Sequence, residues 1–132
     1  MTESLKRTPF SDKRLLVVDD QIIVRQIVSA IGEKLGFGTV DTAQDGDEAL
    51  QMLRKQPYDV VIADWNMQPM TGFELLRTVR ADKEFAAIRF LIMTARTDAA
   101  AILAAKNAGV DGYMLKPFTP QTLQDKILAA VG

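Results

Sequence analysis

The chain has 132 residues, a length that suits one domain with a buried core. It contains neither cysteine nor histidine, which excludes disulfides, thiol chemistry, cysteine metal sites and phosphohistidine on this chain. The net charge of -1 gives no reason to expect nucleic acid or an anionic membrane as a partner. No apolar run is long enough for membrane insertion, so the expected location is cytoplasmic.

Residues 1–13 are polar and hold turn formers but no apolar segment of the kind that a secretory signal needs. We expect a flexible N-terminal leader over residues 1–13, with Phe10 against the body of the protein. A single domain is expected over residues 14–132.

The first half of this domain alternates strands and helices. Leu15–Asp19 is an apolar run typical of a buried strand, and Thr39–Ala43 alternates like a short edge strand. Between them lies a helix that Gly36 ends, and after them one that Pro57 ends. The inner face predicted for the first helix is Ile23, Val24, Ile27, Val28, Ile31 and Leu35. The second helix is marked by Ala49, Leu50 and Leu53.

Val60–Asp64 is apolar until its last residue and predicts a central strand buried on both faces. A loop follows, and Thr71 with Glu74 three residues later matches a capping box for the third helix. The inner face of that helix is predicted to be Leu75, Leu76 and Val79.

The last part continues the alternation. Arg89–Thr94 and Gly112–Leu115 predict two more strands, with a helix between them that Asp98 caps. Pro120 opens the fifth helix at a position where proline is favoured. The inner stripe of this helix is predicted to be Leu123, Ile127, Leu128 and Val131. Five alternations predict an α/β fold with a doubly wound parallel sheet.

Polar residues stand where four of these strands end. They are Asp19, Asp20, Asp64, Thr94 and Lys116. In a parallel sheet these ends share one edge, which is where open α/β sheets bind ligands. Any one of these residues could be an ordinary turn or capping residue, so the prediction of a site depends on their joint placement.

Carboxylates that meet at one edge repel each other and need a cation. Oxygen ligands without histidine or cysteine indicate Mg²⁺ or Mn²⁺. Lys116 supplies a positive charge suited to phosphate, and Thr94 supplies a hydroxyl donor. A carboxylate can also attack phosphorus to form an aspartyl phosphate. The pattern therefore indicates metal-assisted phosphoryl transfer.

Five motifs together carry a family resemblance. They are Asp19-Asp20, Asp64-Trp65-Asn66-Met67, Met93-Thr94-Ala95, Tyr113-Met114-Leu115 and Lys116-Pro117. In this order and spacing the chain resembles the receiver domain of two-component response regulators, most of all stand-alone receivers of the CheY type. The resemblance covers residues 14–131 and implies five parallel strands in the order 2-1-3-4-5 with five helices, the flavodoxin-like fold.

The resemblance also implies roles for residues. Asp64 is the expected phosphoacceptor, and Lys116 and Thr94 contact the phosphoryl group. Mg²⁺ is expected on Asp19, Asp20 and Asp64 and on the backbone carbonyl of Asn66. Tyr113 is the expected switch, moving together with Thr94, and the Lys116–Pro117 peptide is expected to be cis.

The function implied is that of a single-domain response regulator. Its donor would be a phosphohistidine on a sensor histidine kinase or a histidine phosphotransfer protein. Phosphorylation would remodel the face made by the fourth helix, fifth strand and fifth helix, which then binds a downstream target such as a flagellar motor component or another regulator, as in chemotaxis or motility. The chain would not be an enzyme beyond catalysing its own phosphorylation and dephosphorylation, and would be a monomer or a weak phosphorylation-dependent dimer.

Alternatives are a phosphate sink or a phosphotransfer intermediate without an output partner of its own. A phosphatase of the haloacid dehalogenase type would want a second aspartate two residues after Asp64, where this chain has Asn66. A flavodoxin-like flavin binder would need a phosphate loop rich in Ser, Thr and Gly after the first strand. Asp19-Asp20 stands there instead and repels phosphate when no metal is bound.

Overall fold

The computed structural model describes residues 8–131, and over this range the sheet has five parallel strands in the order β2-β1-β3-β4-β5. The predicted sheet and its strand order are therefore confirmed. The strands are β1 (Arg14–Val18), β2 (Thr39–Ala43), β3 (Val60–Asp64), β4 (Arg89–Thr94) and β5 (Gly112–Leu115).

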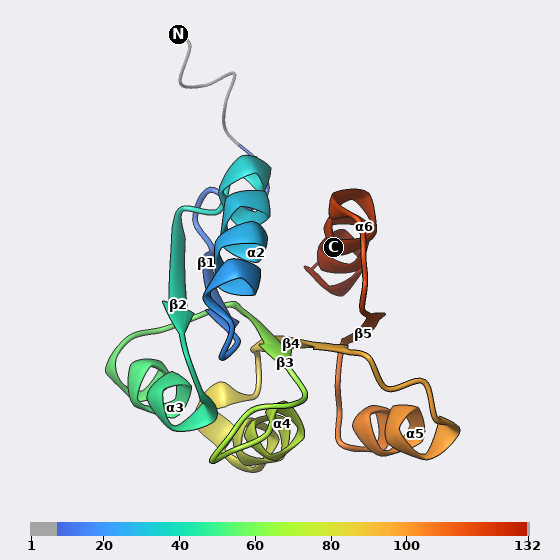
Figure 1. Cartoon of the computed structure of the whole chain (residues 1–132). Coiled ribbons are helices and arrows are strands. Elements are labelled where there is room, and N and C mark those ends of the chain that lie inside the picture. Colours follow the sequence, from blue (N-terminus) through green and yellow to red (C-terminus); the bar gives the residue numbers. More distant parts are fainter. Residues whose placement is uncertain (1–7, 132) are drawn as a thin grey trace, which may run out of the picture.

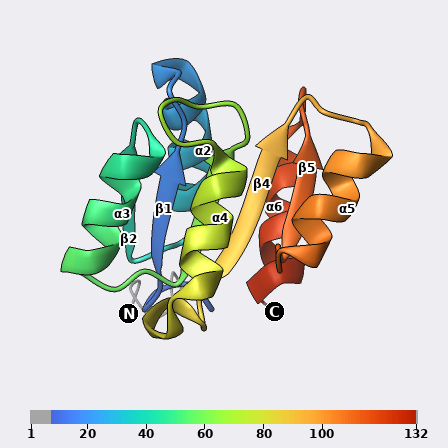
Figure 2. The ribbon, with the colours of Figure 1, turned by 90° about the horizontal axis from the view of Figure 1, so that it is seen from below.

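Helices cover both faces of this sheet. They are α2 (Ile22–Leu35), α3 (Gly46–Lys55), α4 (Gly72–Ala81), α5 (Ala99–Asn107) and α6 (Pro120–Val131), with a short 3₁₀ helix η1 (Lys83–Phe85). Figure 1 shows α2 and α6 on one face and α3, α4 and α5 on the other, and Figure 2 shows the second group in front of the sheet. Between residues 8 and 131 no helix combines the length and the apolar character that crossing a membrane requires.

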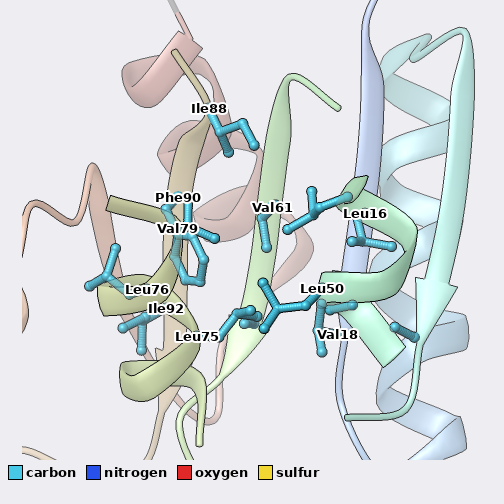
Figure 3. Close-up of a cluster of buried hydrophobic side chains, with 14 of the residues drawn as sticks. Leu16, Val18, Leu50, Val61, Leu75, Leu76, Val79, Ile88, Phe90 and Ile92 are labelled. Atoms are coloured by element: carbon cyan, nitrogen blue, oxygen red, sulfur yellow. The ribbon is translucent and has the colours of Figure 1, made fainter. Parts of the chain in front are cut away.

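The core is split into two layers because side chains alternate along each strand. On the side of α3, α4 and α5, the central strands contribute Leu16, Val18, Val61, Ala63, Phe90 and Ile92 (Figure 3). On the side of α2 and α6, they contribute Leu15, Val17, Val60, Ile62, Leu91 and Met93. All five residues of β3 are buried, which confirms the central strand.

Three helix starts follow the sequence signals. Thr71 and Glu74 form the predicted capping box of α4, with Glu74 N donating to Thr71 Oγ1 at 3.1 Å and Thr71 N donating to Glu74 Oε1 at 2.9 Å. Asp98 caps α5, and Pro120 is the first residue of α6. Gly36 ends α2 with a φ of 97°, a conformation that favours glycine.

The predicted inner face of α2 is confirmed for the four residues that pack in the core, which are Val24, Val28, Ile31 and Leu35. Ile23 and Ile27 are 64% and 49% exposed, whereas Val28 and Gly32 are buried. A Cβ on Gly32 would lie 2.5 Å from Leu15 Cδ2, so the helix can lie this close to the sheet because Gly32 has no side chain. Hydrophobic periodicity gives glycine no weight, so the predicted face missed Gly32 and extended too far, to Ile23 and Ile27.

Leu128 of α6 is likewise 41% exposed, although it was predicted to lie in the inner stripe. Leu123 and Ile127 are fully buried and carry the contact of α6 with the sheet. Because these two residues are four positions apart, they lie on one side of α6 and face the sheet. Leu128 follows Ile127 directly and therefore lies at the edge of that side.

The segment before β1 lies against the domain from Thr8 onward. Phe10 is 3% exposed, which confirms that it packs on the body, and its ring stacks on Phe37 with 4.6 Å between centroids. Gly38 N donates to the Phe10 carbonyl at 3.1 Å. Residues 1–7 of the expected leader lie outside the described residues.

Candidate functional site

Strand register brings the polar strand ends together. Val18 of β1 pairs with Ala63 of β3, so Asp19 and Asp64 follow at neighbouring positions. Asp64 pairs with Met93 of β4, and Thr94 pairs with Leu115 of β5. Parallel strands that end in step therefore place four polar positions at one edge of the sheet.

Three carboxylates converge at this edge. One carboxylate oxygen from each of Asp19, Asp20 and Asp64 lies within 4.8 Å of the others. Asp19 is fully buried and Asp64 is 6% exposed, while Asp20 faces solvent. A buried pair of acids with an exposed third leaves the cluster open on the side of Asp20.

Lys116 is the cation that the structure places against these acids. Its Nζ lies 2.9 Å from Asp64 Oδ1 and 3.4 Å from Asp19 Oδ2. Burial disfavours the ammonium, but the carboxylates of Asp64 and Asp19 outweigh it and raise the pKa of Lys116. Lys116 therefore stays charged, and its peptide bond to Pro117 is cis as expected. The Gln68–Pro69 peptide is also cis.

The acid cluster fits a hard divalent cation. Burial raises the pKa of Asp19 and of Asp64, against the opposing effect of Lys116. Three carboxylates outnumber the single ammonium of Lys116, and every ligand atom that they offer is an oxygen. Mg²⁺ or Mn²⁺ satisfies both conditions, with Asp19, Asp20 and Asp64 as the residues that would hold it.

The loop after β3 forms the open side of the site. Asn66 is exposed and, with Asp20, lines a hollow of about 690 Å³. Gly72 closes the loop by donating its N–H to the Trp65 carbonyl at 3.0 Å. A Cβ at Gly72 would lie 2.2 Å from the Asp64 carbonyl oxygen, so only glycine allows α4 to start this close to the acid.

Thr94 and Tyr113 lie on the face of the sheet that α3, α4 and α5 cover. Thr94 is fully buried, and its Oγ1 accepts a hydrogen bond from Arg96 N at 3.0 Å. Tyr113 is half-buried, and its hydroxyl donates to the Arg96 carbonyl at 3.2 Å. Burial raises the pKa of the Tyr113 phenol, which stays neutral at physiological pH. The two residues are therefore joined through the backbone of one residue, Arg96.

Sequence reasoning missed several contacts around this site. The guanidinium of Arg96 lies over the Trp65 ring, 4.9 Å from its centroid, and binds the carboxylate of Asp98. Arg25 of α2 donates from Nη1 to the Asp19 carbonyl at 2.6 Å. No sequence spacing pointed to the first or the last of these contacts, because each joins residues that are brought together only by the fold.

Replacing Lys116 by methionine is expected to tighten Mg²⁺ binding by about tenfold, because a competing positive charge leaves Asp19 and Asp64. The measurement is calorimetric titration with Mg²⁺. The matched control is Lys126→Met, an exposed lysine of α6, which should leave the affinity unchanged. Equal Mg²⁺ affinity in the Lys116 variant and wild type would mean that the ion binds elsewhere.

Comparisons with known proteins agree with this geometry. A profile of the response regulator receiver domain matches residues 15–128. The chain is 43% identical over 114 residues to the chemotaxis protein CheY-3 of Vibrio cholerae, covering 86% of this chain and 88% of that protein. It is also 43% identical over 114 residues to the chemotaxis protein CheY of Pseudomonas aeruginosa, covering 86% and 92%. Among solved structures, Vibrio cholerae CheY4 superposes with a TM-score of 0.84 at 37% identity, covering 90% of this chain and 98% of that one.

Proposed function

The chain belongs to the response regulator receiver domain family, and on that premise we propose that it is a single-domain response regulator phosphorylated on Asp64. The observation that carries this proposal is the position of Lys116, whose Nζ bridges Asp64 and Asp19 beside a third carboxylate. A lone acid at a strand end could be structural. Asp64 instead shares the Lys116 ammonium with a second buried acid, Asp19, at the open edge of a parallel sheet. This arrangement suits phosphoryl transfer.

The proposed reaction starts with an Asp64 carboxylate oxygen attacking the phosphorus of a phosphohistidine. A phosphorus–oxygen bond forms to Asp64 while the phosphorus–nitrogen bond of the donor breaks. The departing imidazole nitrogen keeps the electron pair of that bond and takes up a proton from solvent water. Lys116 then stands against the transferred group, where its ammonium offsets negative charge, and the Thr94 hydroxyl donates to another phosphoryl oxygen.

A bound Mg²⁺ would neutralise charge on the phosphoryl oxygens as phosphorus passes from donor to acceptor. Asp19, Asp20 and Asp64 are the residues proposed to hold it, together with the backbone carbonyl of Asn66. The open hollow beside Asp20 and Asn66 leaves room at this side of the site for the phosphoryl donor. The donor itself is proposed to be a sensor histidine kinase or a histidine phosphotransfer protein.

The output is proposed to be binding of a target protein at the face formed by α5, β5 and α6. β5 is an edge strand, and α5 and α6 flank it (Figure 2). Apolar side chains are exposed there, with Ile102 at 39%, Leu103 at 57% and Leu115 at 43%. Because relatives at 43% identity are chemotaxis proteins, we place the target in chemotaxis or motility.

The test follows the fluorescence of Trp65, the single tryptophan and the neighbour of Asp64. Mg²⁺ is added first and beryllofluoride, a phosphoryl mimic, second. We expect a saturable change with Mg²⁺ and a further Mg²⁺-dependent change with beryllofluoride. Wild type that responds to neither would refute the proposal.

Two variants make this experiment specific. Asp20→Asn removes one charge of the cluster from a side chain that faces solvent, and it should weaken both responses by roughly tenfold or more. Asp47→Asn removes an equally exposed acid from the first turn of α3 and should leave both responses unchanged.

A further inference from the structure

The Trp65 side chain links the proposed phosphoacceptor strand to its surroundings. Its ring is 7% exposed and stacks on Phe73 of α4, with 5.1 Å between centroids and 12° between planes. It also lies edge-on to Tyr113 of β5, at 6.4 Å and 72°. Contacts with Phe73 and Tyr113 hold the ring on two sides, so its position is tied to that of Asp64, the residue before it.

Arg96 extends this link to α5. Its guanidinium carbon lies 4.9 Å from the Trp65 centroid, while Nε and Nη2 each lie 3.3 Å from an oxygen of Asp98. Asp98 Oδ2 in turn accepts from Ala101 N at 3.0 Å and so caps α5. The Ala101 amide, and after it Arg96, lowers the pKa of Asp98. Side-chain contacts therefore run without a break from Trp65 to the first turn of α5.

The backbone of Arg96 holds the two proposed switch residues. Its N–H donates to Thr94 Oγ1 at 3.0 Å, and its carbonyl accepts from the Tyr113 hydroxyl at 3.2 Å. A displacement of Thr94 toward a phosphoryl group would therefore pull on the Arg96 peptide. The guanidinium would transmit that pull to Asp98.

Trp65, Arg96 and Asp98 together form what we call the Arg96 bridge. We propose that Arg96 is a positioning residue, and that this bridge couples phosphorylation of Asp64 to helix α5. The inference rests on the proposed function, since it needs a ligand at Asp64. Arginine suits this position, because a planar guanidinium can stack on an indole and present two N–H groups to one carboxylate together.

The ion pair in the Arg96 bridge can break and form again easily. The side chains of Arg96 and Asp98 are 43% and 50% exposed, so water can replace their ion pair readily. Leu103 and Ile102, which begin the exposed apolar surface of α5, follow the capped turn directly. A shift of that turn would change how this surface is presented to a target.

The test measures amide hydrogen exchange of the first turn of α5 by mass spectrometry, with Mg²⁺ alone and with Mg²⁺ and beryllofluoride. In wild type we expect beryllofluoride to change the exchange rate of this turn. In Arg96→Gln that change should shrink by about fivefold or more. A saturable change of Trp65 fluorescence with beryllofluoride shows that the variant still binds the mimic.

Further variants distinguish a loss of coupling from a local structural effect of the substitution. Asp98→Asn keeps a capping oxygen for α5 but removes the charge that pairs with Arg96, so it should lose coupling as Arg96→Gln does. Arg96→Lys keeps the charge but not the planar fork and should fail to restore coupling. Arg54→Gln, at an exposed arginine of α3, is the matched control and should couple like wild type.

The outcomes are distinct. Normal coupling in Arg96→Gln or Arg96→Lys, or a wild-type α5 that ignores bound beryllofluoride, overturns this inference and leaves the proposed function standing. A wild type that binds neither Mg²⁺ nor beryllofluoride overturns both.

Discussion

Replacing Asp64 by asparagine is expected to abolish phosphoryl acceptance, with a loss on the order of 10³-fold or more. The amide is nearly the same size as the carboxylate but is not a nucleophile toward phosphorus. It also takes one charge from the three-acid cluster that would hold Mg²⁺. Incubation with phosphoramidate and Mg²⁺ should add the mass of one phosphoryl group to wild type, in an adduct that hydroxylamine removes, and nothing to the variant.

The fold should survive this change. The variant loses the ion pair between Lys116 Nζ and Asp64 Oδ1, but repulsion among the acids falls as well. We expect these effects to offset each other within about 1–2 kcal/mol. A cooperative melt close to that of wild type is therefore the control for folding. An adduct of equal yield in the variant, mapped to another residue, would contradict the assignment of Asp64.

Replacing Phe10 by alanine is expected to lower the free energy of unfolding by about 3–5 kcal/mol, the usual loss for a buried phenylalanine. Phe10 is 3% exposed and stacked on Phe37, in the same apolar layer as Leu15 and Val17. Because domains of this size are stable by about 5–15 kcal/mol, the effect is large. The melting temperature should fall by roughly 10–20 °C, as followed by circular dichroism.

Phe10→Leu is the matched variant, since leucine keeps much of the buried apolar surface. It should lose less than half as much stability as Phe10→Ala. A loss below about 1 kcal/mol in the alanine variant would contradict the result, because it would mean that the segment from Thr8 detaches at little cost. The match to the family begins at residue 15, so the stability that Phe10 adds comes from a segment outside that match.

Local sequence signals accounted for most of the secondary structure. The apolar run Val60–Asp64, the capping box at Thr71 and the cap at Asp98 each depend on neighbours within a few residues. Even so, η1 was not predicted, since three residues are too few to show a period.

The candidate site was predictable for a related reason. Parallel strands of similar length end at one edge, so Asp19 and Asp64 had to be neighbours once the strands were placed. That Lys116 reaches both acids follows from the position of β5, which the motifs suggested through family resemblance. The roles of these residues remain proposals that the variants above will test.

The amino-acid sequence by itself determined the order of the elements, their caps and the polar residues at the strand ends, because each depends on short-range chemistry or on the period of two along a strand. Only the tertiary structure decided that Gly32 of α2 lies against the sheet while Ile23 and Ile27 are exposed, and that a bridge runs from Trp65 through Arg96 to Asp98. Both depend on how closely two elements approach, and that distance is set by packing of the whole core rather than by any one segment.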